Sequence, residues 1–308
     1  MKEKAFVSVI VYIDNNSGTI GSHLSSLDTY LNSFFENYEI ICVNDASTDE
    51  SLIKIKQCCT SLNRDITVIN LAWKHGCDRG IISGIDLSIG DFIVEIEVSK
   101  IDFDFSLIGT LYTEATTGFD IVSAERTEIP SFFDRLFYVI FNKLSYIPFE
   151  LNQEMIRIIS RRSANSLLSM NERVVSRDIL YGFTGFPRKN ITYTPVPDKK
   201  VKNRHFREKL SIAIETIISY SNIGPNLSII IAAVFLIFSL LLSIYALIVF
   251  FTWKEVVPGW TSTALFLSIG FTGIFLVLGI QGRYISSLLI DVKQRPRYIV
   301  RSIDRYKK

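Results

Sequence analysis

Residues 43–49, VNDASTD, carry two carboxylates and two hydroxyl groups at one turn. Asp45 directly follows an apolar run, and Ser47, Thr48 and Asp49 come within the next four positions. Their oxygens can accept hydrogen bonds from the imide of a nucleobase, and the same residue types are preferred at the N-cap of a helix. The stretch therefore has two interpretations, a ligand-binding turn and a helix cap without a ligand.

A second stretch, GDFIVEIEVSKIDFDF at 90–105, opens as a buried strand and carries four carboxylates after Val94. They are Glu95, Glu97, Asp102 and Asp104. Glu95 and Glu97 are two residues apart and share one face of the strand, with Glu95 nearer the middle of the sheet. Carboxylate oxygens are the ligands that hard divalent cations prefer, so the end of this strand is a candidate metal-binding site.

The elements that must position these side chains alternate between apolar runs and helical segments. The expected strands are 6–13, 38–45, 65–72 and 91–98, and the expected helices are 20–36, 49–62 and 79–90. This order predicts a parallel sheet with right-handed crossovers. Ligands of such sheets bind beyond the carboxyl ends of the strands, where VNDASTD, KHGCDRG and EVSKID all fall. Topology alone therefore predicts a binding site at that edge.

Two long apolar runs follow this predicted sheet domain. Residues 227–251 and 261–280 contain no charged side chain. A helix that crosses about 30 Å of hydrocarbon needs about 20 apolar residues, so both runs qualify as transmembrane helices. Buried core helices are the alternative, but such helices rarely run this long without a charge. The short linker between the runs predicts a hairpin whose two ends lie on one side of the membrane.

The segment after the hairpin, 283–308, carries eight Lys and Arg residues against two Asp. The positive-inside rule places this basic tail, and the N-terminal domain with it, in the cytoplasm. We therefore expect a protein of the cell inner (cytoplasmic) membrane with two membrane helices and both termini cytoplasmic. Two amphipathic segments, about 131–147 and 206–222, have basic residues beside an apolar stripe, which favours helices in the bilayer interface over packing on the sheet. The formal charge of +2 is too small to indicate nucleic acid.

Four stretches carry a resemblance to a known family over nearly the whole chain. They are SVIVYIDNN at 8–16, YEIICVNDASTDES at 38–51, NLAWKHGCDRGIISGIDLSIGD at 70–91 and LGIQGRYISSLLIDVKQRPRYIV at 278–300. Together they resemble the inverting, GT-A-fold glycosyltransferases of family 2. Within that family they are similar to the membrane-anchored polyprenyl-phosphate glycosyltransferases, which include dolichyl-phosphate mannose synthase and bactoprenol glucosyltransferases.

The resemblance implies an α/β fold. A GT-A, Rossmann-like and mostly parallel sheet domain would occupy residues 1–205, with amphipathic interfacial helices and a C-terminal two-helix transmembrane hairpin. The implied activity is inverting transfer of a sugar from a nucleotide sugar, a UDP-sugar in preference, to polyprenyl (undecaprenyl) phosphate on the cytoplasmic membrane face. Membrane relatives often form tetramers through their hairpins, so a homo-oligomer is expected.

The resemblance also implies roles for individual residues around the nucleotide. Asp45 would accept a hydrogen bond from the base, and Asn15 would line the nucleotide pocket. Ser47, His75 and Gly76 belong to the same expected site, with a structural role for His75 as the alternative. The acceptor is itself a phosphate of low pKa, which needs little help from a general base.

A divalent ion, Mg²⁺ or Mn²⁺, is implied at the end of the second stretch, where it would neutralise the departing diphosphate. The family's strand ends in Asp-Xaa-Asp with another acid three residues on, and the aligned positions here are Glu97, Ser99 and Asp102. Glu97 and Asp102 are therefore the expected metal ligands and catalytic carboxylates, in a weaker site than the family's. A later acid of the family aligns with Met155, and the adjacent Glu154 is the candidate to replace it.

Cationic side chains that hold the acceptor phosphate are expected at Arg157, Arg177 and Arg204. The altered acids leave two classes of function open. One is an active glycosyltransferase with an altered metal site. The other is a non-catalytic relative that binds nucleotide or partners another membrane glycosyltransferase or a flippase. A transporter or channel subunit is disfavoured, because the two apolar runs contain no charge to line a pathway.

Overall fold

The computed structural model describes the chain at residues 2–59, 62, 64–127, 154–170, 177–196, 230–231, 233–235, 237–238, 241, 259–292 and 296–306. These residues fall into two compact units. The first comprises the described residues up to 196 together with 296–306, and the second comprises those between 230 and 292. The predicted segments 131–147 and 206–222, and Arg204, lie outside the described residues.

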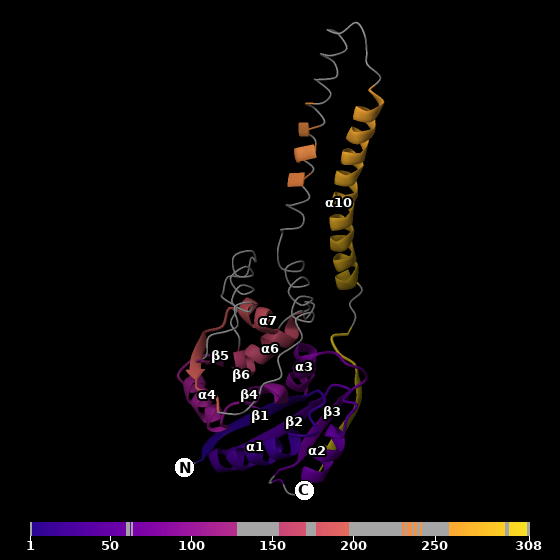
Figure 1. Cartoon of the computed structure of the whole chain (residues 1–308). Helices are drawn as coiled ribbons and strands as arrows, with labels where there is room; N and C mark the ends of the chain where they lie inside the picture. Colours follow the sequence, from indigo (N-terminus) through magenta and orange to yellow (C-terminus); the bar gives the residue numbers. More distant parts are fainter. Residues whose placement is uncertain are drawn as a thin grey trace. The chain divides into compact units, whose positions relative to one another are not determined.

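An eight-stranded sheet forms the centre of the first unit, in the order β7-β5-β6-β4-β1-β2-β3-β8 (Figure 1). Its strands are β1 (Glu3–Ile13), β2 (Phe35–Asn44), β3 (Ile66–Leu71), β4 (Phe92–Glu97), β5 (Ile121–Arg126), β6 (Glu154–Ser160), β7 (Arg188–Tyr193) and β8 (Val300–Tyr306). The first four strands are parallel to one another, which confirms the predicted parallel sheet. β6 pairs antiparallel with β4, and β8 pairs antiparallel with β3.

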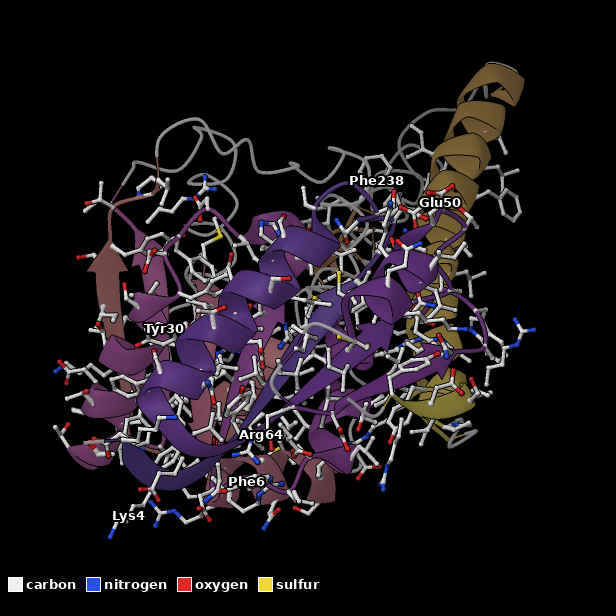
Figure 2. All side chains as sticks on the ribbon, turned by 90° about the horizontal axis from the view of Figure 1, so that it is seen from below. Lys4, Phe6, Tyr30, Glu50, Arg64 and Phe238 are labelled. Atoms are coloured by element: carbon white, nitrogen blue, oxygen red, sulfur yellow. The ribbon has the colours of Figure 1, made fainter. Side chains whose placement is uncertain are left out.

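Helices pack on both faces of this sheet. One face carries α1 (Ile20–Phe34), α2 (Ser51–Cys59) and α4 (Ser106–Thr116), and the other carries α3 (Cys77–Leu87), α6 (Arg161–Ser169) and α7 (Arg177–Phe183). In β1, Val9 and Val11 join the core under α1, whereas Ile10 and Tyr12 join the core under α3. Side chains alternate across a strand, so a strand buried on both faces reads as a continuous apolar run. Figure 2 shows the side chains of the structure as sticks, seen from below, with Phe6 of β1 and Tyr30 of α1 labelled.

Two glycines allow α3 to approach β1 closely. A Cβ atom at Gly84 would lie 2.5 Å from the Ile10 side chain, and one at Gly80 would lie 2.7 Å from the Tyr12 ring. Real atoms do not approach so closely in a packed core, so any side chain here would push the helix away from the strand. The close packing brings Gly76, at the start of α3, beside Asp45.

The carboxyl ends of the four parallel strands meet at one edge of the sheet. β1 lies between β2 and β4, so the chain leaves β1 towards one side and later returns on the other. Ligands of open α/β sheets bind in the crevice at such a switch point. The loops at this edge are 14–19, 45–50, 72–76 and 98–105, which contain the predicted nucleotide residues and Asp102, and Glu97 ends β4 beside them.

The predicted basic tail is not separate from the sheet domain. Residues 300–306 form β8, an edge strand that pairs antiparallel with β3 and sets Ser302 opposite Asn70. Its residues alternate between half-buried and exposed, as expected for a strand with one wet face. The preceding helix continues to Val292, so the first residues of the predicted tail 283–308 are helical.

The second unit contains α10 (Trp260–Val292), a helix of 33 residues. It includes residues 261–280, where a transmembrane helix is expected, and it exposes large apolar side chains that include Leu267, Phe271 and Ile274. No helix among the described residues meets both the length and the apolar content that a membrane crossing requires. Most of the other predicted run, 227–251, lies outside the described residues.

Candidate active site

Asp45 is the buried centre of the predicted nucleotide site. Its side chain has no exposed surface, and its Oδ1 accepts a hydrogen bond from the backbone N–H of His75 over 2.7 Å. Its Oδ2 accepts one from the N–H of Gly76 over 2.8 Å and one from the Tyr12 hydroxyl over 2.6 Å. The carboxylate therefore joins the ends of β1 and β2 to the loop after β3. Burial and the Asp45 carboxylate raise the pKa of Tyr12, so Tyr12 remains a donor.

Asn15 holds the loops after β1 and β2 against each other. It has a left-handed backbone, with φ of 54°, a conformation that Asn tolerates better than most residues. Its N–H donates to Ser47 Oγ over 3.1 Å, and its Oδ1 accepts from the N–H of Thr48 over 2.9 Å. The structure thus brings Asn15 and Ser47 together, as the sequence predicted, and leaves Asn15 and Thr48 exposed at the rim.

Asp49 confirms the capping interpretation of the same turn. Its Oδ1 accepts from the N–H of Ser51, the first residue of α2, over 3.0 Å, and its Oδ2 accepts from the N–H of Ser17 over 2.9 Å. Burial by itself would raise the pKa of Asp49, but these hydrogen bonds to the charged form outweigh it and lower the pKa to about 2. Asp49 therefore serves the helix and the loop after β1, and the ligand-binding interpretation of the turn stays a prediction.

The loop after β3 carries a pair of stacked rings. The rings of Trp73 and His75 are 4.9 Å apart and inclined by 12°. His75 Nδ1 lies 2.5 Å from the carbonyl oxygen of Trp73, and its Nε2 accepts from the N–H of Ile299 over 3.1 Å. Both contacts are satisfied by the neutral tautomer with its proton on Nδ1. The His75 side chain thus has a structural role, whereas the Trp73 side chain is 55% exposed.

Glu97, the last residue of β4, is already paired with a cation. Its Oε2 lies 2.8 Å from Lys100 Nζ, and its Oε1 accepts from the Ser99 hydroxyl over 2.7 Å. The Cys77 thiol contacts the same carboxylate, with Sγ 3.3 Å from Oε2. Burial and the Glu97 charge raise the pKa of Cys77, so the thiol stays protonated and donates to Glu97.

Asp102 belongs to a different network. Its side chain is buried, its Oδ1 accepts from the Tyr193 hydroxyl over 2.6 Å, and its Oδ2 lies 2.6 Å from Arg126. Tyr193 packs in the core under α1, whereas Cys77, the partner of Glu97, packs in the core under α3. The two carboxylates therefore point into networks on opposite sides of the sheet.

A shared Mg²⁺ or Mn²⁺ site at Glu97 and Asp102 does not fit this arrangement. Each carboxylate is neutralised by its own cationic side chain, Lys100 or Arg126. Among the described residues, no group of three His, Cys, Asp or Glu side chains is placed to hold a metal ion. A divalent ion needs several oxygen ligands converging on one point, and the two carboxylates do not converge.

A buried ion network lies behind Glu97, under α7. Glu95 on β4 stands directly opposite Arg157 on β6 in the sheet register. Glu95 accepts hydrogen bonds from Arg177 and from the Tyr181 hydroxyl, and its Oε2 lies 3.5 Å from Arg157 Nη1. The Arg157 guanidinium also lies over the Tyr181 ring, 4.6 Å from its centroid. Burial and the nearby Glu95 raise the pKa of Tyr181, which keeps this donor protonated.

The network engages the residues predicted for catalysis and phosphate binding. Glu154 and Asp178 both accept hydrogen bonds from Arg157, and Asp78 Oδ1 lies 3.0 Å from Arg177 Nε. Although burial alone would raise the pKa of Asp178, the two arginines hold it below its usual range. Arg157 has 4% of its side chain exposed. The roles predicted for Glu154, Arg157 and Arg177 therefore stay predictions, and this geometry gives all three a structural role.

The similarity to a known family lies in the first half of the chain. Residues 8–158 match the profile of the family described as glycosyl transferase family 2. The chain carries a family 2 glycosyltransferase domain. This domain runs from β1 into β6, so it includes the turn at Asp45 and the end of β4.

Relatives extend the similarity beyond this glycosyltransferase domain. The prophage bactoprenol glucosyl transferase homolog of Escherichia coli (strain K12) is 25% identical over 96% of this chain and 99% of that protein. The undecaprenyl-phosphate 4-deoxy-4-formamido-L-arabinose transferase of Shewanella sediminis (strain HAW-EB3) is 25% identical over 97% of this chain and 92% of that protein. The fold is similar to that of mannosyl-3-phosphoglycerate synthase from Rubrobacter xylanophilus, with a TM-score of 0.51, 14% identity, and 70% and 73% of the two chains covered.

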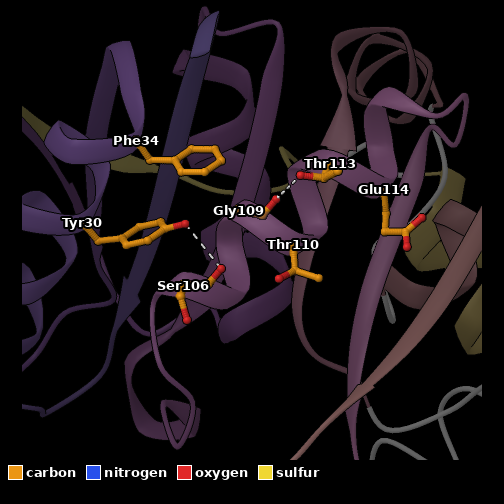
Figure 3. Close-up of a pocket in the computed structure, with 7 residues that line it drawn as sticks. All are labelled: Tyr30, Phe34, Ser106, Gly109, Thr110, Thr113 and Glu114. Atoms are coloured by element: carbon orange, nitrogen blue, oxygen red, sulfur yellow. Dashed lines mark hydrogen bonds between the residues drawn. The ribbon is translucent and has the colours of Figure 1, made fainter. Parts of the chain in front are cut away.

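A hollow of about 410 Å³ lies away from this site, between α1 and α4 of the glycosyltransferase domain (Figure 3). Tyr30 and Phe34 line it from α1, and Thr113 and Glu114 line it from α4. A Cβ atom at Gly109 would lie 2.3 Å from the Tyr30 hydroxyl, so the glycine allows the tyrosine to lie against α4. None of the predicted site residues lines this hollow.

The sequence interpretation missed three side chains that shape the site. Tyr12 binds Asp45, Lys100 pairs with Glu97, and Arg126 pairs with Asp102. Tyr12 carried a usable signal, because it stands at the carboxyl end of a strand and beside the turn loops. Lys100 lies within the stretch that suggested the metal, and its charge was a signal against one.

Proposed function

We propose that this chain transfers a sugar from a nucleotide-sugar donor to polyprenyl phosphate at the cytoplasmic face of a membrane. The turn at Asp45 carries this proposal, because it joins three loops at the carboxyl edge of a family 2 glycosyltransferase domain. The nucleoside would lie over the rim formed by Asn15, Thr48 and Trp73, with the diphosphate directed towards the end of β4. A UDP-sugar is the favoured donor.

The acceptor assignment draws on the relatives and on the apolar segments. The names of two relatives refer to bactoprenol and to undecaprenyl phosphate, which supports a lipid-linked phosphate as the acceptor here. The uncharged runs 227–251 and 261–280 support a transmembrane hairpin, with interfacial helices at 131–147 and 206–222 beside it. We place both termini in the cytoplasm, and we expect the hairpins to support a homo-oligomer such as a tetramer.

The proposed reaction forms one bond and breaks one bond at the anomeric carbon. An oxygen of the acceptor phosphate attacks this carbon from the face opposite the nucleotide, so the configuration inverts. The bond between the carbon and the diphosphate oxygen breaks, and its electron pair leaves on the diphosphate. The acceptor is already ionised near neutral pH, so the main demand on the protein is to stabilise negative charge on the leaving group.

A non-catalytic relative is the second candidate function. Met155, which aligns with an acid of the family, is 5% exposed in the core under α1. Glu97 and Asp102 are each paired with a cation, as described above. Such a protein would bind a nucleotide, or partner another membrane glycosyltransferase or a flippase, without turnover.

Transfer of radiolabelled sugar to undecaprenyl phosphate tests the proposal. The purified full chain in detergent would receive a panel of UDP- and GDP-sugars with Mg²⁺, with Mn²⁺ and with EDTA, and reactions without the lipid would serve as the control. A lipid-linked product from any donor is the expected result. Nucleotide binding without product from any donor would favour the non-catalytic relative. Absence of both binding and product would contradict sugar transfer and nucleotide binding alike, and would leave only the partnering form of the second candidate.

A further inference from the structure

Lys100 is the accessible cation at the end of β4. It belongs to the short 3₁₀ helix Val98–Lys100, which continues the strand into the carboxyl edge of the sheet. Its side chain is 26% exposed, compared with 4% for Arg157 and 11% for Arg177 in the network behind it. A ligand at the edge therefore meets Lys100 before it meets either arginine.

Lys100 has capacity for a further partner. An ammonium group carries three N–H donors. Among the described residues, its Nζ pairs with Glu97 alone. A phosphate oxygen can thus bind Lys100 without displacing Glu97, and the carboxylate then holds the ammonium in place.

The charges around this point disfavour a second, metallic cation. Glu97 and Asp102 are already neutralised by Lys100 and Arg126, and their networks lie on opposite sides of the sheet. A divalent ion at Glu97 would have to displace Lys100 or lie beside its positive charge. Like charges a few ångströms apart repel strongly in a partly buried site, so the lysine and the ion are alternatives.

We infer that Lys100, in place of a divalent cation, neutralises the leaving diphosphate. This inference rests on the proposed transfer from a nucleotide sugar. As the bond from the anomeric carbon to the diphosphate breaks, the electron pair moves onto the diphosphate oxygen, and the Lys100 ammonium faces that charge. No proton transfer is required, because the acceptor phosphate attacks as an anion. Glu97 acts as a positioning residue that holds the ammonium at the strand end.

A purely structural role for Lys100 predicts a different effect of removing it. An ion pair between residues three apart contributes little to stability when it is partly exposed. If that were the whole role of Lys100, its removal would leave the affinity for nucleotide unchanged. Affinity for UDP therefore separates the two interpretations, and it requires no turnover.

Calorimetric titration of the full chain with UDP, in EDTA and in Mn²⁺, tests the inference. We expect the two affinities to agree within about twofold. Lys100→Met should lower the affinity about 10- to 100-fold in both buffers, which is the loss expected for hydrogen bonds to a charged group. Lys100→Arg should restore most of it. Glu97→Gln keeps an oxygen that can hold the ammonium, so it should change the affinity less than Lys100→Met does.

Lys189→Met provides the matched control. Lys189 is also paired with a glutamate, 2.6 Å from Glu114, but its partner lines the hollow between α1 and α4. Its removal should leave the affinity for UDP unchanged. An affinity for UDP at least tenfold lower in EDTA than in Mn²⁺, with no effect of Lys100→Met, would overturn this inference and leave the proposed function standing. Failure of the unaltered chain to bind UDP or GDP in either buffer would overturn the proposed function and this inference with it.

Discussion

The backbone N–H of Ile299 donates a hydrogen bond to His75 Nε2 across 3.1 Å, although the two residues are 224 positions apart. The backbone N–H of His75 in turn donates to Asp45 over 2.7 Å. Ile299 also accepts a hydrogen bond from the N–H of Ala72 over 2.9 Å, so the residue before β8 holds the loop after β3 at two points. The C-terminal segment therefore supports the proposed nucleotide site from behind.

Ile299→Pro removes the N–H that binds His75. We expect the affinity for UDP to fall a few-fold, because the lost hydrogen bond stabilises the ordered conformation of the 72–76 loop by about 1 kcal/mol. Calorimetric titration gives the affinity, and amide hydrogen exchange at 72–76 should become faster. Arg301→Ala, an exposed change in β8, is the control and should alter neither measurement. Unchanged exchange in the proline variant would show that the loop is ordered without this contact.

Asp45→Asn should destabilise the domain. An amide has one oxygen where the carboxylate uses two, so its NH₂ group would face either the N–H of His75 or both the N–H of Gly76 and the Tyr12 hydroxyl. We expect a loss of about 2–3 kcal/mol in the free energy of unfolding, measured by chemical denaturation. Tyr12→Phe removes one of the three hydrogen bonds and should cost about 1 kcal/mol. Equal losses in the two variants would argue against Asp45 as the centre of the turn.

Arg157→Met separates a structural role from phosphate binding. The change leaves Glu95 and Glu154 buried without their shared cation, so we expect a loss of about 3–5 kcal/mol in the free energy of unfolding. Arg162→Met removes an ion pair with Asp120 in which the Arg162 side chain is 67% exposed, and should cost far less stability than Arg157→Met. A stable Arg157→Met variant that loses transfer to the lipid would instead support the predicted contact with the acceptor phosphate.

The Asp49 cap should depend on pH in acid. The native pKa of Asp49 is lowered to about 2, below its ordinary value of 3.8. The charged cap therefore contributes stability that is fully present above about pH 4 and is lost as the pH falls towards 2. We expect Asp49→Ala to cost about 1 kcal/mol at pH 6. The difference in thermal midpoint between this variant and the unaltered chain should narrow between pH 4 and pH 2.5, and a constant difference would contradict the lowered pKa.

The sequence by itself determined the sheet and the place of the site. The mostly apolar runs at 6–13, 38–45, 65–72 and 91–98 correspond to β1 to β4, because a parallel strand between two helix layers is largely apolar on both faces. The parallel order then placed the ends of these strands at one edge. Asn15 and Ser47 were expected to lie together for that reason, and they do.

The tertiary structure decided the partners of the charged side chains. Glu97, Arg157 and Arg177 were predicted as ligands of a metal or a phosphate, yet each is paired with a side chain of opposite charge. Pairing of this kind depends on which residues of β4, β6 and α7 face each other, and no local pattern encodes it. The same holds for β8. The sequence analysis treated its short alternating run as part of a basic tail. The strand was missed because its pairing partner β3 lies some 230 residues earlier, and only the folded sheet brings the two strands together.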